Sequence, residues 1–124
     1  MIKFKKLDHV QICIPEGKEN EARDFYTGII GLTEIPKPKA LMQNGGLWYQ
    51  VADIQLHIGT EKDLNKSKRH PAFEVEDLKE ARKHLEQSGL QIKEEVRIPG
   101  QDRFSFTDPF GNRIELLQKH NKAN

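Results

Sequence analysis

The fold is decided by LDHVQI at residues 7–12, whose pattern returns as HPAFEV at residues 70–75. The similarity continues outward from both stretches. Each is followed by an EAR triplet, a Gly-Leu pair and a closing apolar strand that holds one polar residue. The offset between corresponding points stays between 58 and 61 residues over most of the chain. A steady offset of this kind predicts one supersecondary unit that is used twice.

Each unit is predicted to contain one strand, one helix and then three strands. Alternating apolar and polar residues predict the strands, and apolar residues at i, i+3, i+4 and i+7 predict the helices. The predicted strands cover residues 4–14, 32–35, 47–51 and 54–59 in the first unit, and 70–75, 91–98, 103–107 and 113–118 in the second. The first helix covers residues 22–30, and the second begins after a capping Asp77 and ends at Gly89.

The whole chain of 124 residues has the length of a single domain built from these two units. We expect the first unit at roughly residues 4–59 and the second at roughly residues 70–118. A polar linker is expected between them at 60–69, and a polar tail follows at 119–124.

The charge balance argues against a nucleic-acid partner. Twenty lysines and arginines oppose nineteen acidic residues, which leaves a formal net charge of +1. A nucleic-acid-binding domain usually carries a clear basic excess on one face, and the short basic clusters here are offset by nearby acids.

The lone cysteine and the lack of long apolar runs bear on the compartment. Cys13 has no partner for an internal disulfide, which fits a reducing environment. No signal peptide and no membrane span are expected, because no apolar run approaches about 20 residues. We therefore expect a cytoplasmic protein without membrane contact.

Four polar side chains occupy corresponding positions in the two units. His9 and His70 lie in the opening strands, and His57 and Glu115 lie in the closing strands. In each strand the polar residue is flanked by apolar neighbours that point the other way. We therefore predict that all four face one polar surface, where imidazole nitrogens and a carboxylate suit a divalent metal ion.

This arrangement resembles the vicinal oxygen chelate superfamily, which includes glyoxalase I, bleomycin resistance proteins, fosfomycin resistance proteins and extradiol dioxygenases. The resemblance rests on LDH at residues 7–9, on HxxFxV from residue 70 and on DPFGNRIEL at residues 108–116. It implies an α+β fold in which two tandem βαβββ modules form an open, cup-shaped mixed sheet with helices outside. It also implies that metal ligands project into the cup from the first and last strands, here His9, His57, His70 and Glu115.

The histidine at position 57 departs from the glyoxalase I-like members, where a glutamate usually ligates the metal and acts as base. His57 can therefore be a fourth ligand or a general base, since an unperturbed pKa of about 6.5 suits proton transfer. With His57 free, His9, His70 and Glu115 form the set seen in extradiol dioxygenases and fosfomycin resistance transferases. His57 and Glu115 are the candidate catalytic residues.

Further side chains are candidates for contacts with a substrate: Gln11, Trp48, Gln50, Arg103 and Arg113. Gln11 shares its strand face with His9, while Trp48 and Gln50 alternate with apolar neighbours. The two arginines could bind an anionic group of the substrate. An ion pair at the rim of the sheet is an equally good reading of both.

The resemblance and these residues favour a small-molecule enzyme. A divalent metal ion (zinc, nickel, manganese or iron(II)) would bind two substrate oxygens and stabilise an oxyanion. Proton transfer or isomerisation is favoured over ring cleavage or thiol transfer, so a lyase, isomerase or dioxygenase is expected. The alternative is a metal-free protein of the bleomycin resistance type that sequesters a drug or metabolite. The resemblance also implies a homodimer, with each cup completed within one chain or by exchange across the dimer.

Overall fold

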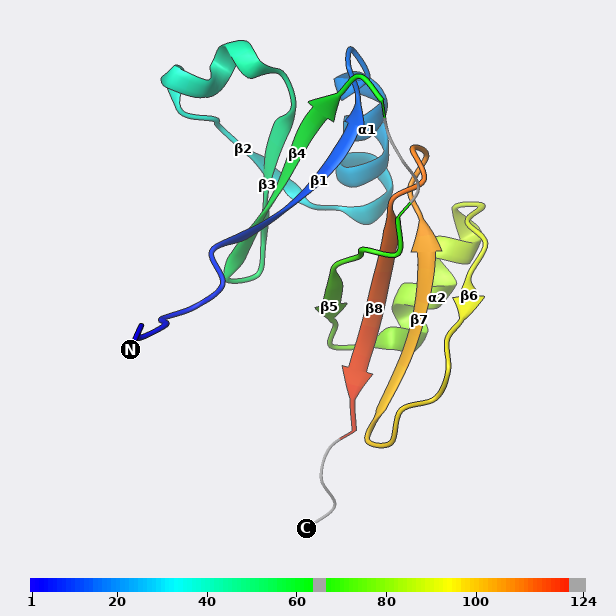
Figure 1. The fold of residues 1–124 in the computed structure, drawn as a ribbon. Helices are drawn as coiled ribbons and strands as arrows, with labels where there is room; N and C mark the ends of the chain where they lie inside the picture. Colours follow the sequence, from blue (N-terminus) through cyan, green and yellow to red (C-terminus); the bar gives the residue numbers. More distant parts are fainter. Residues whose placement is uncertain (64–66, 121–124) are drawn as a thin grey trace. The chain divides into compact units, whose positions relative to one another are not determined.

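Each half of the chain forms its own four-stranded mixed sheet in the computed structural model, which describes residues 1–63 and 67–120 (Figure 1). The chain divides into a first unit, Met1–Asn65, and a second unit, Lys66–Asn124. The same order of strand, helix and three strands recurs in both. The predicted α+β class with one repeated unit is confirmed.

The first unit places its opening strand beside its closing strand. Its elements are β1 (His9–Pro15), α1 (Glu19–Phe25), β2 (Thr33–Ile35), β3 (Leu47–Val51) and β4 (Ile54–Glu61). The sheet order is β1-β4-β3-β2, in which β1 and β4 run parallel and the other pairs are antiparallel. A parallel pair requires a long crossover, and here α1, β2 and β3 lie between the two strands in sequence.

One face of the first sheet forms the core of this unit. Alternate residues of the strands are buried there: Ile12, Ile14, Leu47, Tyr49, Leu56 and Ile58. The helical region packs against the same face, since Tyr26 lies beside the ring of Tyr49 and Thr27 shares a 2.8 Å hydrogen bond with its hydroxyl. The polar residues between these positions are therefore left on the opposite face.

The first strand and the first helix differ from the predicted bounds. Pairing begins at His9 rather than at residue 4, because the partner strand turns away at residues 52–53. The helix begins at Glu19, and its final segment η1 (Tyr26–Ile30) is π-helical. A 3₁₀ segment, η2 (Lys39–Asn44), forms where the sequence predicts only a loop.

The second unit repeats this topology with the sheet order β5-β8-β7-β6. Its elements are β5 (Ala72–Glu74), α2 (Leu78–Gln87), β6 (Lys93–Glu94), β7 (Gln101–Thr107) and β8 (Arg113–Lys119). Again the opening and closing strands are parallel. Asp77 caps α2 as predicted, since its carboxylate accepts a hydrogen bond from Glu80 N. The core of this unit includes Leu78, Leu85, Phe104, Phe106 and Ile114.

Two strands of the second unit are shorter than predicted. β5 begins at Ala72 because Pro71 has no N–H for the ladder, although the Pro71 carbonyl still accepts from Glu115 N at 3.0 Å. β6 holds only two residues of the predicted 91–98, and the carbonyl of Val96 is bonded by Arg103 instead of by a neighbouring strand.

Parts of the predicted linker and tail, residues 64–66 and 121–124, lie outside the described residues. Within the described ranges, no helix has the length and apolar character needed to cross a membrane.

The backbone at Gly46, just before β3, lies very close to β4, and a substitution at this position tests that close approach. Gly46 has a φ of +83°, and a Cβ there would lie 2.0 Å from the Ile58 carbonyl oxygen. Gly89, at the end of α2, has a φ of +88° and open space where a Cβ would lie, which makes Gly89→Ala the matched control. Both substitutions should cost roughly 1–2 kcal/mol for backbone strain. Gly46→Ala should cost a further 1–3 kcal/mol, roughly, for the steric overlap, measured by urea unfolding. Equal losses would contradict the close approach.

Candidate functional site

The polar face of the first sheet gathers residues from three strands. Gln11 of β1 and Trp48 of β3 are both register partners of His57 on β4. Because residues opposite each other across a sheet point to the same side, the three side chains share one face, and His9 joins them two residues along β1. The structure thus brings His9, Gln11, Trp48 and His57 together within this unit.

Three rings form a stack on this face. The ring of His57 lies parallel to Trp48, with centroids 3.8 Å apart and planes inclined by 3°. His9 stacks on His57 at 4.0 Å and 17°. The side chain of His57 is therefore enclosed on both faces, and the residue is only 6% exposed.

His57 is held at one ring nitrogen as well as at both faces. Its Nε2 lies 2.9 Å from the amide oxygen of Gln55, two residues earlier on the same strand. Burial lowers the pKa of His57 below its usual value; the nearby His9 lowers it further, and Asp8 opposes both. Burial and the neighbouring His9 thus favour the neutral form of His57.

His9 is oriented by its neighbour in sequence. Its Nδ1 lies 2.9 Å from a carboxylate oxygen of Asp8, and because a carboxylate can only accept, Nδ1 carries the proton. The hydrogen bond from His9 lowers the pKa of Asp8. In a neutral His9 the lone pair then lies on Nε2, which is the arrangement found in metal-ligating histidines whose other nitrogen donates to a carboxylate.

A cavity of about 770 Å³ lies over this face of the first unit. Its walls include the ring stack, Gln11 and residues of the η2 segment such as Leu41 and Asn44. Gln50, also predicted to line the pocket, turns elsewhere: its amide donates to the carbonyls of Ala52 and Ile54 at 2.8 and 3.0 Å. The cavity lies within the size range of small-molecule sites.

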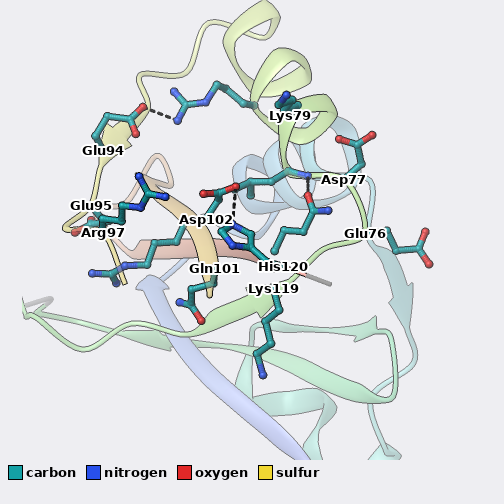
Figure 2. Close-up of a pocket in the computed structure, with 14 residues that line it drawn as sticks. Glu76, Asp77, Lys79, Glu94, Glu95, Arg97, Gln101, Asp102, Lys119 and His120 are labelled. Carbon is teal, nitrogen blue, oxygen red and sulfur yellow. Dashed lines mark hydrogen bonds and ion pairs between the residues drawn. The ribbon is translucent and has the colours of Figure 1, made fainter. Parts of the chain in front are cut away.

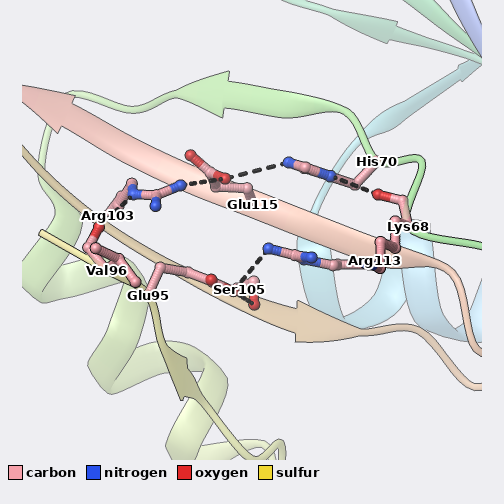
Figure 3. A network of polar contacts seen from close by, with 8 residues as sticks. All are labelled: Lys68, His70, Glu95, Val96, Arg103, Ser105, Arg113 and Glu115. Carbon is pink, nitrogen blue, oxygen red and sulfur yellow. Dashed lines mark hydrogen bonds and ion pairs between the residues drawn. The ribbon is translucent and has the colours of Figure 1, made fainter. Parts of the chain in front are cut away.

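The polar face of the second sheet centres on a buried carboxylate (Figure 3). Glu115 is 4% exposed, and its Oε1 accepts a hydrogen bond from Nη1 of Arg103 at 3.0 Å. The Nε2 of His70 lies 3.3 Å from the same oxygen. The predicted pair His70 and Glu115 is therefore in direct contact within this unit.

His70 is oriented in the same manner as His9. Its Nδ1 lies 3.0 Å from the carbonyl oxygen of Lys68, so that nitrogen carries the proton. In a neutral His70 the lone pair of Nε2 therefore faces a carboxylate oxygen. Two such acceptors at 3.3 Å require a proton or a cation between them.

A second carboxylate, Glu95, lies beside this group and was not foreseen from the sequence. Its Oε2 accepts from the hydroxyl of Ser105 and from Nη2 of Arg113, the latter at 3.0 Å. The hydrogen bond from Ser105 lowers the pKa of Glu95, and the charge of Arg113 lowers it further, although burial acts in the opposite direction. Nothing in the local sequence distinguishes Glu95 from the other charged residues of 93–97, so only the fold reveals it.

Both arginines that were candidates for anion binding are ion-paired. Arg103 pairs with Glu115, and its Nε also donates to the carbonyl of Val96. Arg113 pairs with Glu95 at 3.0 Å. The geometry thus matches the ion-pair reading of these residues, with the carboxylates supplied by the site itself.

The second unit also holds a cavity of about 780 Å³ between α2, the segment after β6 and the ends of β7 and β8 (Figure 2). Two ion pairs lie among the charged groups around it: Arg82 pairs with Glu94, and His120 with Asp102 at 3.2 Å. Arg103 and Glu95 reach this cavity from the network of Figure 3. No pattern in the sequence predicts this cavity.

The predicted metal set is drawn from both units, and each unit brings one pair together. His9 contacts His57 in the first, and His70 contacts Glu115 in the second. Within residues 1–63 and 67–120, no three histidine, cysteine or acidic side chains are clustered closely enough to form a complete metal site.

Comparison with known families decides the relationship. The family model of the Glyoxalase/Bleomycin resistance protein/Dioxygenase superfamily matches residues 6–116. The chain belongs to this superfamily. A crystal structure of a glyoxalase family protein from Bacillus anthracis is 40% identical, with a TM-score of 0.92 and coverage of 97% of this chain and 99% of that chain.

More distant superfamily structures share the fold. The antibiotic binding protein TnmS3 from Streptomyces sp. CB03234 is 18% identical, with a TM-score of 0.76 and coverage of 97% of this chain and 100% of that chain. A mutant of the fosfomycin resistance protein FosX from Listeria monocytogenes, complexed with Mn(II) and 1S,2S-dihydroxypropylphosphonic acid, is 20% identical. Its TM-score is 0.75, and 95% of each chain is covered. A sequence comparison with curated proteins gave no match.

The buried ion pair of Arg103 and Glu115 should be essential for the stability of the second unit. Arg103→Leu leaves the carboxylate buried without its cation, which typically costs about 3–5 kcal/mol. The double variant Arg103→Leu/Glu115→Leu removes both charges and should recover more than half of that loss. Urea unfolding of the parent, both single variants and the double variant measures the coupling. Additive losses would contradict a direct interaction.

Glu95 should make stability depend on pH. Its pKa in the folded state lies below the ordinary 4.5, so the ionised group stabilises the fold above about pH 4.5, and this contribution is lost as the pH falls through the folded-state pKa. Ser105→Ala removes the main cause of the shift and should flatten the loss of stability between about pH 5 and pH 3. Ser88→Ala, a hydroxyl deletion at the end of α2, is the control. Urea midpoints measured across this range would refute the assignment if both variants kept the slope of the parent.

Proposed function

We propose that this chain is a metal-dependent enzyme of the superfamily, in which His9, His70 and Glu115 hold a divalent ion and a small molecule binds through two oxygens. The observation that carries the proposal is the contact in the second unit. The Nε2 of His70 and the Oε1 of Glu115 face each other at 3.3 Å. Two ligands that bind one metal at about 2.1 Å with a tetrahedral angle lie about 3.4 Å apart.

The orientation of both histidines supports this ligand set. Each donates from Nδ1 to a fixed oxygen, of Asp8 for His9 and of Lys68 for His70, and each keeps Nε2 for a further partner. Such outer partners fix the tautomer of ligating histidines. Imidazole and carboxylate donors suit zinc, manganese, iron(II) and nickel, so the residues fit the class of metal that the sequence predicts.

His57 is assigned to the reaction rather than to the ligand set. Its ring is enclosed between Trp48 and His9, and its Nε2 already lies against Gln55. Coordination through Nε2 would require the loss of this hydrogen bond. A neutral His57 on the same face as His9 is suited to move a proton to or from a substrate held in the cavity of the first unit.

The resulting chemistry is proton transfer or isomerisation on a small molecule with two neighbouring oxygens. When bound, the metal supplies charge that polarises these oxygens. Trp48 and Gln11 line the cavity and contact the substrate, and Arg103 fixes one oxygen of Glu115 by its hydrogen bond. The Mn(II) in the FosX structure supports the choice of a divalent ion, and ring cleavage or thiol transfer follow as less favoured reactions.

A second candidate is a metal-free protein that binds a drug or metabolite. The specific observation that favours it is the aromatic wall of Trp48, His57 and His9 along a cavity of about 770 Å³. Aromatic walls are typical of sites for drug-sized ligands. The structural similarity to the antibiotic binding protein TnmS3 is in line with it. For either function we propose a cytoplasmic homodimer.

The metal content of the untagged protein separates the two candidates. We expect a near-stoichiometric divalent metal in the parent by mass spectrometry. The double variant His9→Ala/Glu115→Gln should lose metal affinity by at least about tenfold, because two ligands are removed. His57→Ala should keep the metal content of the parent. His84→Ala, on the exposed side of α2, controls for loss of an unrelated histidine.

The outcomes divide cleanly. A parent protein that binds no metal after incubation with zinc, nickel, manganese or iron(II) would overturn the proposal of a metal-dependent enzyme and leave that of a metal-free binding protein. Loss of metal in His57→Ala would restore His57 to the ligand set. Because Trp48 is the sole tryptophan and stacks on His57, its fluorescence reports ligand or metal binding on this face in every variant.

A further inference from the structure

We propose that Gln55 is a positioning residue for His57: its amide oxygen keeps the proton on Nε2 and leaves Nδ1 as the lone pair that His57 offers. This deepens the proposed function and rests on it, since it names the nitrogen with which His57 would exchange a proton with the substrate. No role for Gln55 follows from the sequence pattern alone.

The argument begins with the strand. Gln55 and His57 are two residues apart on β4, so their side chains leave the sheet on the same side. The distance between His57 Nε2 and Gln55 Oε1 is 2.9 Å. An amide oxygen can only accept a hydrogen bond, so Nε2 must be the donor. A neutral imidazole carries one proton, which makes Nδ1 the acceptor.

The ring cannot easily turn to exchange its nitrogens. Trp48 and His9 lie against its two faces at 3.8 and 4.0 Å, and His57 is almost fully buried. A half-turn of the ring must pass through orientations that break both stacking contacts, and it removes the hydrogen bond to Gln55. The stack therefore fixes the plane of the ring, and Gln55 fixes which nitrogen carries the proton.

The neighbouring amide of Gln50 does not compete with Gln55 for the hydrogen bond to His57. Gln55 lies opposite His9 on β1 and opposite Gln50 on β3. The amide of Gln50 is bound to the carbonyls of Ala52 and Ile54, so it does not compete for the ring. Gln50 is thus a control residue of the same type, on the same face and next to Gln55.

Nitrogen-resolved NMR of the metal-free full chain tests the proposal at about pH 8, where imidazoles are neutral. A buried, hydrogen-bonded Nε2–H exchanges slowly with water and should give an observable ¹H–¹⁵N signal, assigned to His57 by its loss in His57→Ala. We expect this signal in the parent and in Gln50→Leu. It should also persist in Gln55→Glu, whose carboxylate still accepts, and disappear in Gln55→Leu.

Two results would overturn the proposal: a protonated Nδ1 of His57 in the parent, or an Nε2–H signal that survives in Gln55→Leu. Absence of the signal from the parent would overturn it as well. Metal content measured on the same parent protein separates this inference from the proposed function. An empty protein with the Nε2–H signal refutes metal dependence and retains the role of Gln55, whereas a loaded protein that lacks this signal in its metal-free form refutes the role of Gln55 alone.

Discussion

The parallel pairing of the first and last strands in each unit is the constraint on which the remaining structure depends. It places His9 opposite Gln55 in the first unit and Ala72 opposite Glu115 in the second. Because parallel strands cannot be joined by a tight turn, each unit must carry a long crossover between them, which here consists of a helix and two further strands. The same pairing brings the start and the end of each unit together, so two residues far apart in sequence become neighbours on one polar face.

The parallel pairing in the second unit buries a carboxylate, and this burial costs free energy unless a positive charge lies nearby. A carboxylate as buried as Glu115 is stable only with a partner, and Arg103 supplies it from the neighbouring strand. The guanidinium group of Arg103 also donates a hydrogen bond to the carbonyl of Val96. This bond takes the place of a hydrogen bond between strands in the segment after β6. The shortness of β6 is therefore linked to the burial of Glu115.

The repeat and the strand alternation could be predicted from the sequence, because burial of one sheet face leaves a period-two signature. This signature is enough to group His9, Gln11, Trp48 and His57 on one face and to set His70 beside Glu115. The amide of Gln55 and the carboxylate of Glu95 could not be predicted. Their roles depend on the ring stack and on contacts between strands, which leave no trace in a single sequence. The predicted bounds of β1 and β6 were wrong for the same reason, since the length of each strand depends on where its partner strand ends.

The charges of the second unit bear on the proposed enzyme, in which a bound metal would stabilise negative charge on substrate oxygens. Two neutral imidazoles and one carboxylate leave a divalent ion with a net charge of about +1. Arg103 adds a positive charge at Glu115, while the second carboxylate, Glu95, is offset by Arg113. In the proposed enzyme, such a balance would favour negative charge on the substrate oxygens over positive charge. Since both carboxylates of the second unit are bound to arginines, the proposed function assigns the exchange of a proton with the substrate to His57.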